Sequence, residues 1–346
     1  MKVTYFAHSV LCRGGDKMIL AHLNHLVSAG HNVTIRAAVV DTAFTLHEDI
    51  VVRRLPNISK FGTLSVALLT KQEADCIIAS IAPTAAFLSL RNRGRVLHYA
   101  QDDNETAYRC FLIRFLIRLL YFLIFSIFKI PTITVSRDLA EMFRDRYGVD
   151  CITIGNGVDE EVFFPSPSSE LIAEKQERKS VVIFSRKDFR KGYDIACQTI
   201  ARLAETSEVP IEVWTIGGEV LDTAWGSIPH RHFGHIDEQR LRTILSSADV
   251  LLYPSRSEGF GLLVLEAFAC NCPVVTSTAV TFARHGENAL VGMPGDVETL
   301  AAHTRLILGD DQVAKRIAEG GHRFSQKHSL ADSTMHFEQE ISLLFG

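Results

Sequence analysis

Two carboxylates lie eight residues apart around a glycine-rich turn within Asp249–Val275 (DVLLYPSRSEGFGLLVLEAFACNCPVV). The turn Glu258–Gly261 follows a predicted strand, and a predicted helix begins near Leu262. The glycines let the backbone approach a ligand closely, and free N–H groups at the helix amino terminus attract phosphate or hydroxyl oxygens. Glu266, one turn inside the helix, can accept hydrogen bonds from a ribose diol. A lone EGFG would indicate an ordinary turn with surface glutamates, but this second carboxylate favours a ligand site.

A cationic loop follows the first predicted strand of the second half of the chain. Within Ser185–Gly192 (SRKDFRKG), Arg186 and Lys191 lie at opposite ends of a strand-to-helix connection. Such connections lie at the carboxyl ends of the strands, where doubly wound sheets bind ligands. Two cations there would neutralise a diphosphate and stabilise charge on a leaving group. The alternative is a solvated basic loop, since four of its eight residues are cationic.

Two loops of the first half carry further candidates. Gly14 and Gly15 precede a predicted helix in LCRGGDKMI, but this stretch has neither the GxGxxG spacing nor the Walker A pattern. The segment LHYAQDDN ends a predicted strand and brings polar groups together at His98, Gln101 and Asp102. We expect Gln101 or Asp102 to contact the substrate. A histidine beside a strand is more often structural, so His98 is either a structural residue or a catalytic one.

Short β-branched runs alternate with helix-length segments such as Lys17–Ala29 and Thr84–Leu90, which predicts parallel sheets covered on both faces. In the first half the predicted strands are Val3–Phe6, Val33–Ala37, Ile50–Arg54, Cys76–Ser80, Val96–Tyr99, Ile133–Val135 and Ile152–Ile154. In the second half they are Val181–Phe184, Ile211–Ile216, Val250–Tyr253, Val274–Thr276 and Leu290–Val291. We therefore predict two doubly wound α/β halves, joined near Gly155–Pro167, where Gly, Pro and Ser accumulate.

Length and composition fit this organisation. The chain has 346 residues, or about two domains. Apolar residues (47%) and charged residues (22%) have the proportions of a globular protein. Lys plus Arg (36) nearly balance Asp plus Glu (40), so no global field would hold nucleic acid. Seven cysteines without CxxC spacing argue against disulfides and structural zinc, and we find no signal-peptide pattern, so we expect a cytoplasmic protein.

The segment Phe111–Phe128 (FLIRFLIRLLYFLIFSIF) stands apart because it is almost entirely apolar. Its length would suit a bilayer span, but Arg114 and Arg118 interrupt it, and each would cost about 2.5–3.5 kcal/mol at a membrane centre. On a helix the two arginines share one face, and Lys129 closes the segment. This pattern predicts a helix on the membrane surface over residues 111–129, with its basic side toward anionic headgroups. One alternative is a core helix whose arginines extend their charged ends to solvent. The other is a helix that spans the membrane.

These motifs resemble those of glycosyltransferase family 4, whose members have the GT-B fold and transfer sugars with retention. EGFGLLVLEA is similar to the E-x7-E signature of that family, and GGDKMILAHLNHLVSAGHNVTI to its opening loop, first helix and second strand. GNGVDEEVFFP resembles its interdomain segment, and Arg186 with Lys191 matches its diphosphate-binding R-x4-K pair. HYAQDDN is similar to a stretch of rhamnosyltransferase-like members. TSTAVTFARHGENALV departs from the family's Gly-Gly-x-x-Glu pattern.

The resemblance implies two Rossmann-like domains facing a cleft: an acceptor-side domain (1–160), a donor-binding domain (161–328) and a C-terminal helix (329–346) that returns to the first domain. It also implies a UDP-, GDP- or dTDP-linked sugar donor, with no cofactor and no required metal ion. The donor-binding residues would be Gly14, Gly15, Arg186, Lys191, Glu258, Gly259, Phe260, Gly261, Leu262 and Glu266. The catalytic residues would be Glu258, Arg186, Lys191, His98 and Asp102, with Gln101 and Asp102 on the acceptor side.

We therefore expect a retaining, metal-independent glycosyltransferase that moves a sugar to a hydroxyl of a glycan or lipid-linked acceptor in surface polysaccharide synthesis. It would act in the cytoplasm or on the cytoplasmic face of the membrane. One alternative is a nucleotide-sugar epimerase or hydrolase of the same fold, which would process donor without acceptor. The other is a non-catalytic, membrane-docked nucleotide-sugar-binding protein, which would bind donor without turnover.

Overall fold

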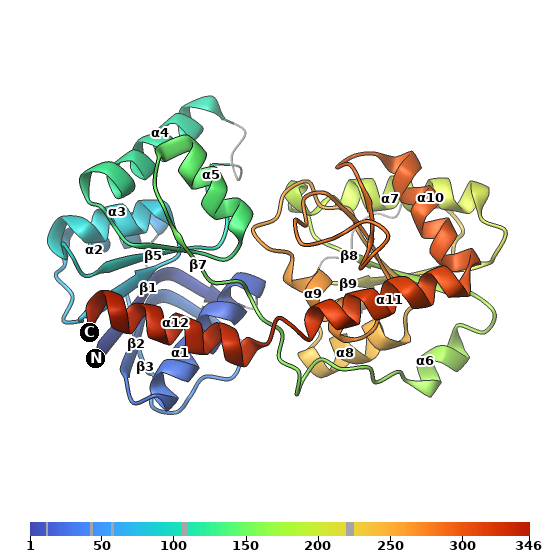
Figure 1. The fold of residues 1–346 in the computed structure, drawn as a ribbon, viewed down its shortest axis with the longest axis horizontal. Coiled ribbons are helices and arrows are strands. Elements are labelled where there is room, and N and C mark those ends of the chain that lie inside the picture. The colour runs from blue at the N-terminus through green and yellow to red at the C-terminus, as the bar shows by residue number, and fades with distance from the viewer. Residues whose placement is uncertain (12, 42–43, 57–58, 106–109, 219–224) are drawn as a thin grey trace. The chain divides into compact units, whose positions relative to one another are not determined.

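The structure is a computed structural model, which describes residues 1–11, 13–41, 44–56, 59–105, 110–218 and 225–346. The chain forms two compact units (Figure 1). The first comprises Met1–Asn156 together with Leu330–Gly346, and the second comprises Gly157–Ser329. Each unit is built around its own sheet, as the restart of the strand pattern predicts.

The first unit contains a parallel sheet of seven strands in the order β3-β2-β1-β4-β5-β6-β7. Its strands are β1 (Lys2–Leu11), β2 (Asn32–Asp41), β3 (Val51–Arg54), β4 (Cys76–Ala79), β5 (Val96–Ala100), β6 (Thr132–Thr134) and β7 (Ile152–Thr153). Its helices are α1 (Gly14–Ser28), α2 (Lys60–Leu69), α3 (Ala82–Arg91), α4 (Phe111–Phe122) with a π-helical turn at Leu123–Ile127, α5 (Arg137–Tyr147) and α12 (Leu330–Phe345). The central strands β4 and β5 are buried throughout, as expected of parallel strands covered on both faces.

The second unit contains a parallel sheet of six strands in the order β10-β9-β8-β11-β12-β13. Its strands are β8 (Lys179–Phe184), β9 (Ile211–Ile216), β10 (His230–Gly234), β11 (Val250–Tyr253), β12 (Val274–Ser277) and β13 (Leu290–Gly292). Its helices are α6 (Ser169–Glu174), a 3-10 turn at Phe189–Lys191, α7 (Tyr193–Thr206), α8 (Glu238–Ser247), α9 (Leu262–Ala269), α10 (Val297–Gly309) and α11 (Asp311–Ser325). The sequence analysis missed β10 because this edge strand, HRHFG, has no buried residue and therefore no apolar run.

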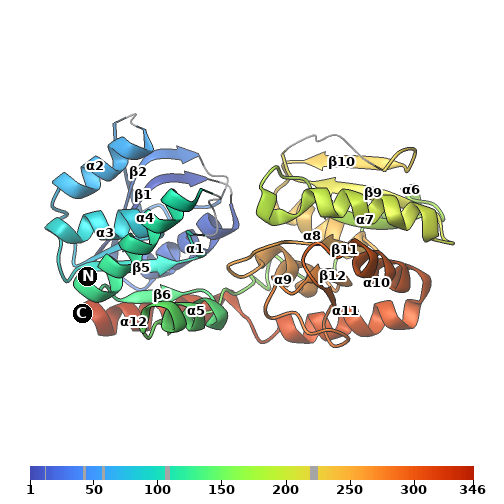
Figure 2. The same cartoon turned by 90° about the horizontal axis from the view of Figure 1, so that it is seen from above.

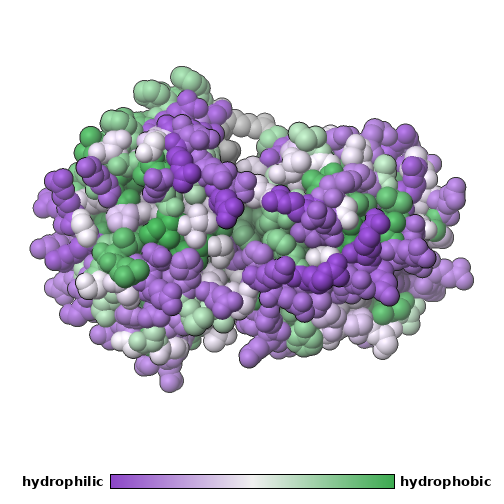
Figure 3. Space-filling model, in the orientation of Figure 1, coloured by the Kyte–Doolittle hydropathy of each residue, from purple (hydrophilic) through white to green (hydrophobic). Residues whose placement is uncertain are grey.

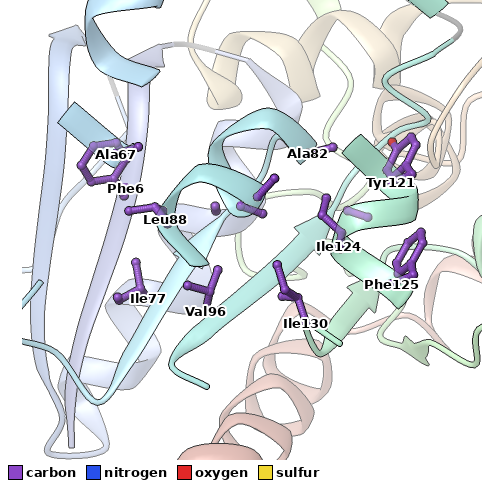
Figure 4. Close-up of a cluster of buried hydrophobic side chains, with 14 of the residues drawn as sticks. Phe6, Ala67, Ile77, Ala82, Leu88, Val96, Tyr121, Ile124, Phe125 and Ile130 are labelled. Atoms are coloured by element: carbon purple, nitrogen blue, oxygen red, sulfur yellow. The ribbon is translucent and has the colours of Figure 1, made fainter. Parts of the chain in front are cut away.

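One hydrophobic core of the first unit lies between the sheet and the helices α2, α3, α4 and α5 (Figure 4). Phe6 of β1 and Ile77 of β4 belong to the same buried cluster as Leu88 of α3. Tyr121 of α4 and Ile124 of the π-helical turn extend this cluster along the apolar segment 111–128. One side of that segment is therefore packed as a core helix, which was one of the alternatives that the sequence left open.

The C-terminal helix α12 packs on α1. The ring of His22 stacks on Phe337 with centroids 4.3 Å apart, and its Nε2 lies 3.1 Å from the hydroxyl of Tyr99. Burial lowers the pKa of His22 to about 3, so this ring is a neutral packing group. Ser333 Oγ also donates a hydrogen bond to the carbonyl of Gly155 (2.8 Å). These contacts fix the end of the chain to the first unit, where both termini lie close together (Figures 1 and 2).

Candidate functional site

The two loops that the sequence analysis singled out in the second unit lie side by side. Strands β8 and β11 pair in parallel, so the loops that follow them leave the same edge of the sheet. Arg256 joins the loops: its backbone N–H donates to the carbonyl of Arg190 (2.7 Å), and its guanidinium pairs with Asp194 (2.7 Å). The cationic loop and the EGFG turn thus form one continuous surface.

Lys191 and Glu258 form an ion pair between these loops. Lys191 Nζ lies 2.7 and 2.9 Å from the two carboxylate oxygens of Glu258, and the side chains are 19% and 5% exposed. Ser255 Oγ donates to the same carboxylate (2.6 Å), and the hydroxyl oxygen of Tyr253 lies 3.3 Å from the ammonium group. Burial disfavours the charged lysine, but Tyr253 and Glu258 outweigh it and raise the pKa of Lys191. Lys191 is therefore a fixed cation in a preorganised cluster.

Arg186 supplies a second cation at this edge of the sheet. It lies two residues beyond β8 and is partly exposed, and no other group in the described part of the chain forms a hydrogen bond or ion pair with its guanidinium. A diphosphate would therefore find Arg186 open, but it would reach Lys191 only by sharing that cation with Glu258. Among the described residues, no three His, Cys, Asp or Glu side chains are grouped so that they could hold a metal ion.

The amino terminus of α9 follows the ion pair directly. Gly261, the residue before the helix, has a φ of 103°, a left-handed conformation that favours glycine. Phe260 packs against Phe282 with ring centroids 4.8 Å apart, which anchors the turn. The first N–H groups of a helix have no partner within it and can bind an anion. Gly259 and Leu262 are partly exposed on either side of this turn, so a ligand can approach its backbone.

Glu266 and His98, two of the predicted site residues, are buried. Glu266 is 5% exposed in α9, so only a small part of this residue can meet a ribose hydroxyl. His98 is 1% exposed in β5, beside the rings of Tyr121 and Phe143, and burial lowers its pKa to about 4. In this structure His98 is a neutral core residue, and a catalytic role would require its surroundings to open. Both assignments stay predictions.

In the first unit, the glycine loop and the acceptor-side loop are in contact. Both β1 and β5 pair with β4, so the loops that follow them leave the same edge of the sheet. Gln101 Nε2 donates to the carbonyl of Gly15 at the start of α1 (2.8 Å). A Cβ atom on Gly15 would collide with the end of the Gln101 side chain, which would have to shift. Gly14, Gln101 and Asp102 are not buried, so this edge is accessible to a ligand.

The sequence analysis missed the residue that holds this acceptor-side loop in place. Glu105 is 1% exposed, and its carboxylate accepts hydrogen bonds from Arg118 (2.7 and 2.9 Å) and Arg114 (2.8 and 3.0 Å). Arg146 of α5 approaches it to 3.4 Å. The hydrogen bond from Arg118 is the main reason that the pKa of Glu105 is lowered. Two arginines four residues apart in an apolar helix were the available signal, but we predicted contacts with lipid headgroups, or snorkelling from a core helix, and no carboxylate partner.

The outer side of α4 is apolar and exposed. Six large side chains there are between 46% and 79% exposed: Phe111, Leu112, Phe115, Leu116, Leu119 and Phe122. Apolar side chains gather over α4 at the top of the first unit in Figure 3. The segment therefore combines a packed inner face with an uncovered outer face. No helix among the described residues has both the length and the apolar composition of a membrane span.

Comparisons with known proteins show what this chain is similar to. Residues 178–310 match the profile of the family described as "Glycosyl transferases group 1". Glycogen synthase from Mycobacterium tuberculosis H37Rv is 34% identical over 145 residues, which cover 38% of this chain and 34% of that protein. Phosphatidyl-myo-inositol mannosyltransferase from Mycolicibacterium smegmatis is 30% identical over 211 residues, which cover 56% and 53%. The curated relatives are thus matched over 22% to 53% of their own length.

Solved structures share the fold over nearly the whole chain. Sucrose-phosphate synthase from Thermosynechococcus elongatus has a TM-score of 0.80 at 18% identity, covering 100% of this chain and 99% of that one. WaaG, a glycosyltransferase involved in lipopolysaccharide biosynthesis, has a TM-score of 0.79 at 16% identity, covering 99% and 100%. The predicted fold class, GT-B with two Rossmann-like α/β units, is therefore confirmed. The match of residues 178–310 to the group 1 glycosyltransferases supports the resemblance found in the sequence.

Proposed function

We propose that this protein is a glycosyltransferase that moves a sugar from a UDP-, GDP- or dTDP-linked donor to a hydroxyl of a glycan or lipid-linked acceptor. The observation that carries the proposal is the cationic cluster of the second unit. Arg186 and the Lys191–Glu258 pair follow the neighbouring strands β8 and β11, and the turn that carries Glu258 leads into α9, all inside the segment that matches the family. The structural neighbour HepE from Anabaena was solved with UDP-glucose, which supports a nucleotide-sugar donor.

The donor's diphosphate would be bound between cations and backbone N–H groups. Arg186 and Lys191 would neutralise its oxygens, and the first N–H groups of α9 would donate to it. Because Lys191 is already held by Glu258 and Tyr253, little reorganisation accompanies the development of charge on the leaving group. Glu258 would then lie near the donor sugar, and Glu266 near the ribose.

In the chemical step the departing diphosphate would act as the base, and the protein would stabilise its charge. The bond between the anomeric carbon and the diphosphate oxygen breaks, and its electron pair stays on the diphosphate. The acceptor hydroxyl oxygen forms the new bond on the same face of the sugar, and its proton passes to the departing diphosphate oxygen. This route retains the configuration of the anomeric carbon and requires no metal ion, because the two cations and the N–H groups stabilise the diphosphate.

We further propose that the enzyme works in the cytoplasm, at the cytoplasmic surface of the membrane, in the synthesis of surface polysaccharide. The exposed apolar side of α4 supports this location, because a bilayer surface would cover it. Relatives named O-antigen chain mannosyltransferase B and lipopolysaccharide core biosynthesis glycosyltransferase support the acceptor class. Gln101 and Asp102 of the first unit would contact the acceptor.

A thermal-shift screen with UDP-, GDP- and dTDP-sugars tests the donor site. We expect one donor class to raise the melting temperature, because a ligand that binds only the folded state stabilises it by mass action. The shift should disappear in Arg186→Ala and Lys191→Ala and persist in Lys187→Ala, which removes an exposed lysine of the same loop. A protein that no sugar nucleotide stabilises would contradict the proposal.

The stabilising donor, carrying a radiolabelled sugar, then tests the reaction with extracted membrane lipids as acceptor. Transfer to the lipid fraction that persists in EDTA, with a retained anomeric configuration by NMR, is the expected result. Turnover of donor without acceptor would indicate an epimerase or hydrolase instead. Binding without any turnover would indicate a non-catalytic nucleotide-sugar-binding protein.

A further inference from the structure

The acceptor-side loop, Gln101–Glu105, is held to four helices of the first unit. At its start, Gln101 donates to a carbonyl at the beginning of α1. In its middle, Asn104 Oδ1 accepts a hydrogen bond from the backbone N–H of Ala82 at the start of α3 (2.9 Å). The backbone N–H of Asn104 donates to the hydroxyl of Tyr121 in α4 (3.0 Å). The last residue, Glu105, contacts both α4 and α5.

Glu105 is the strongest of these attachments. Its buried carboxylate accepts four charge-assisted hydrogen bonds from Arg114 and Arg118, and charge-assisted bonds are stronger than those between neutral groups. Asp103 adds to the attachment, because its carboxylate accepts from the backbone N–H of Glu105 (3.0 Å) and from Arg146 (3.1 Å). The loop is therefore tied to both α4 and α5.

The outer face of α4 has the chemistry of a surface that meets lipid. Its six exposed apolar side chains recur at the three- and four-residue spacing of one helix face. Arg114 and Arg118 border this face, and their side chains are 44% and 53% exposed. Arg146, 43% exposed, lies beside them, so three cations face two carboxylates, Asp103 and Glu105, at this border. An apolar face with a cationic border complements an anionic bilayer.

We propose that Glu105 is a positioning residue: it ties the acceptor-side loop to α4, so that docking of α4 on an anionic bilayer fixes Gln101 and Asp102 for a lipid-linked acceptor. This inference rests on the proposed transferase function and on its location at the membrane. It assigns Glu105 no contact with substrate. It explains why a fully buried carboxylate lies between a polar loop and a helix whose other face is exposed and apolar.

Hydrogen exchange with and without vesicles tests this coupling in the full chain. The probe is phosphatidylcholine vesicles that contain phosphatidylglycerol, with pure phosphatidylcholine vesicles for comparison. In the wild type, we expect the anionic vesicles to slow amide exchange in both α4 and the acceptor-side loop by about tenfold or more. In Glu105→Gln, α4 should remain protected while the loop loses its vesicle-dependent protection. Arg118→Lys keeps the positive charge but not the planar guanidinium group, so its loop protection should lie between those of the wild type and Glu105→Gln.

Two controls keep the outcomes distinct. Asp150→Asn breaks the exposed pair between Arg144 of α5 and Asp150 in the loop that follows, and it should leave both protections intact. Leu116→Ser on the outer face of α4 should remove the vesicle-dependent protection of both α4 and the loop. If vesicles protected the loop equally in the wild type and in Glu105→Gln, the coupling between loop and helix would be overturned. If anionic vesicles did not protect α4 of the wild type, docking of α4 on the bilayer would be overturned. Protection of α4 that rises with protein concentration and needs no vesicles would show that a second copy covers it, which also overturns the inference. None of these results depends on donor binding, which the thermal-shift screen tests separately.

Discussion

Each unit of this chain buries a carboxylate against cations, and the two clusters differ in the number of cations that contact the carboxylate. In the second unit, Glu258 faces one ammonium group, that of Lys191, with Ser255 and Tyr253 completing the contacts. In the first unit, three guanidinium groups surround Glu105. In the described part of the chain Lys191 pairs with one carboxylate, so an anionic ligand can share the lysine with Glu258. A carboxylate enclosed by three guanidinium groups holds structure together. Burial of an ion pair therefore does not by itself distinguish a site from a structural attachment.

The largest expected effect is on the second-unit cluster. Lys191→Ala should lower sugar transfer by on the order of 10²–10³-fold, as the loss of a preorganised charge-stabilising group does. The measurement is the initial rate of radiolabel transfer at saturating donor. Lys187→Ala is the matched control and should keep the wild-type rate. A Lys191→Ala enzyme with full activity would remove Lys191 from the mechanism and make its pair with Glu258 structural, like that of Glu105.

Substitutions in the first-unit cluster should mainly lower the stability of the fold. Glu105→Gln should lower the free energy of unfolding by about 2 kcal/mol, because it removes charge-assisted hydrogen bonds while the half-exposed arginines regain water. Urea unfolding at neutral pH measures this loss. Asp150→Asn, in a fully exposed pair, should cost about 0.5 kcal/mol or less. If the two variants were equally stable, Glu105 would not be the main attachment of the acceptor-side loop.

The pH dependence of stability sharpens the contrast. The pKa of Glu105 is lowered in the folded protein, mainly by Arg118, so its contribution is fully present above the unfolded pKa of about 4.3. The contribution is lost as the pH falls through the lower, folded pKa. The stability difference between wild type and Glu105→Gln should therefore shrink as urea unfolding is repeated from pH 7 down to pH 3. A difference that stays constant over this range would contradict the ion-pair account.

The smallest effect concerns the contact between the two loops of the first unit. Gly15→Ala should displace the side chain of Gln101 and break its hydrogen bond to the backbone, at a cost of about 1 kcal/mol in unfolding free energy. The double variant Gly15→Ala/Gln101→Gly removes the colliding side chain. The double variant should therefore be more stable than it would be if the stability losses of the two single variants simply added. Simple additivity would show that the two residues do not interact as the structure indicates.

Much of the fold could be predicted from the sequence because buried parallel strands form continuous apolar runs. The strands β8 and β11, which carry the two loops of the second-unit cluster, are of this kind. The edge strand β10 could not be found in the same way, since none of its residues is buried. Helix boundaries were less accurate: α1 begins at Gly14, three residues before the predicted start.

The candidate site was predictable in its loops but not in its pairs. Arg186, Lys191 and Glu258 follow neighbouring strands, and strand order alone brings such loops together. The pairing of Lys191 with Glu258 joins residues 67 positions apart, and no local pattern encodes it. Nor does the sequence around His98 show that Tyr121 and Phe143 will enclose it. The partner of Arg114 and Arg118 was missed because their spacing predicts a shared helix face and says nothing about the group that binds them.

The central claim is that the cations of the second unit bind the diphosphate of the donor. Isothermal titration calorimetry with UDP, GDP and dTDP tests it most directly, because these probes carry the diphosphate and no sugar. We predict that at least one of them binds the wild type and Lys187→Ala equally, and that Arg186→Ala and Lys191→Ala each weaken binding by about tenfold or more, the loss of a charged hydrogen bond. Unchanged affinity in both variants would contradict the account.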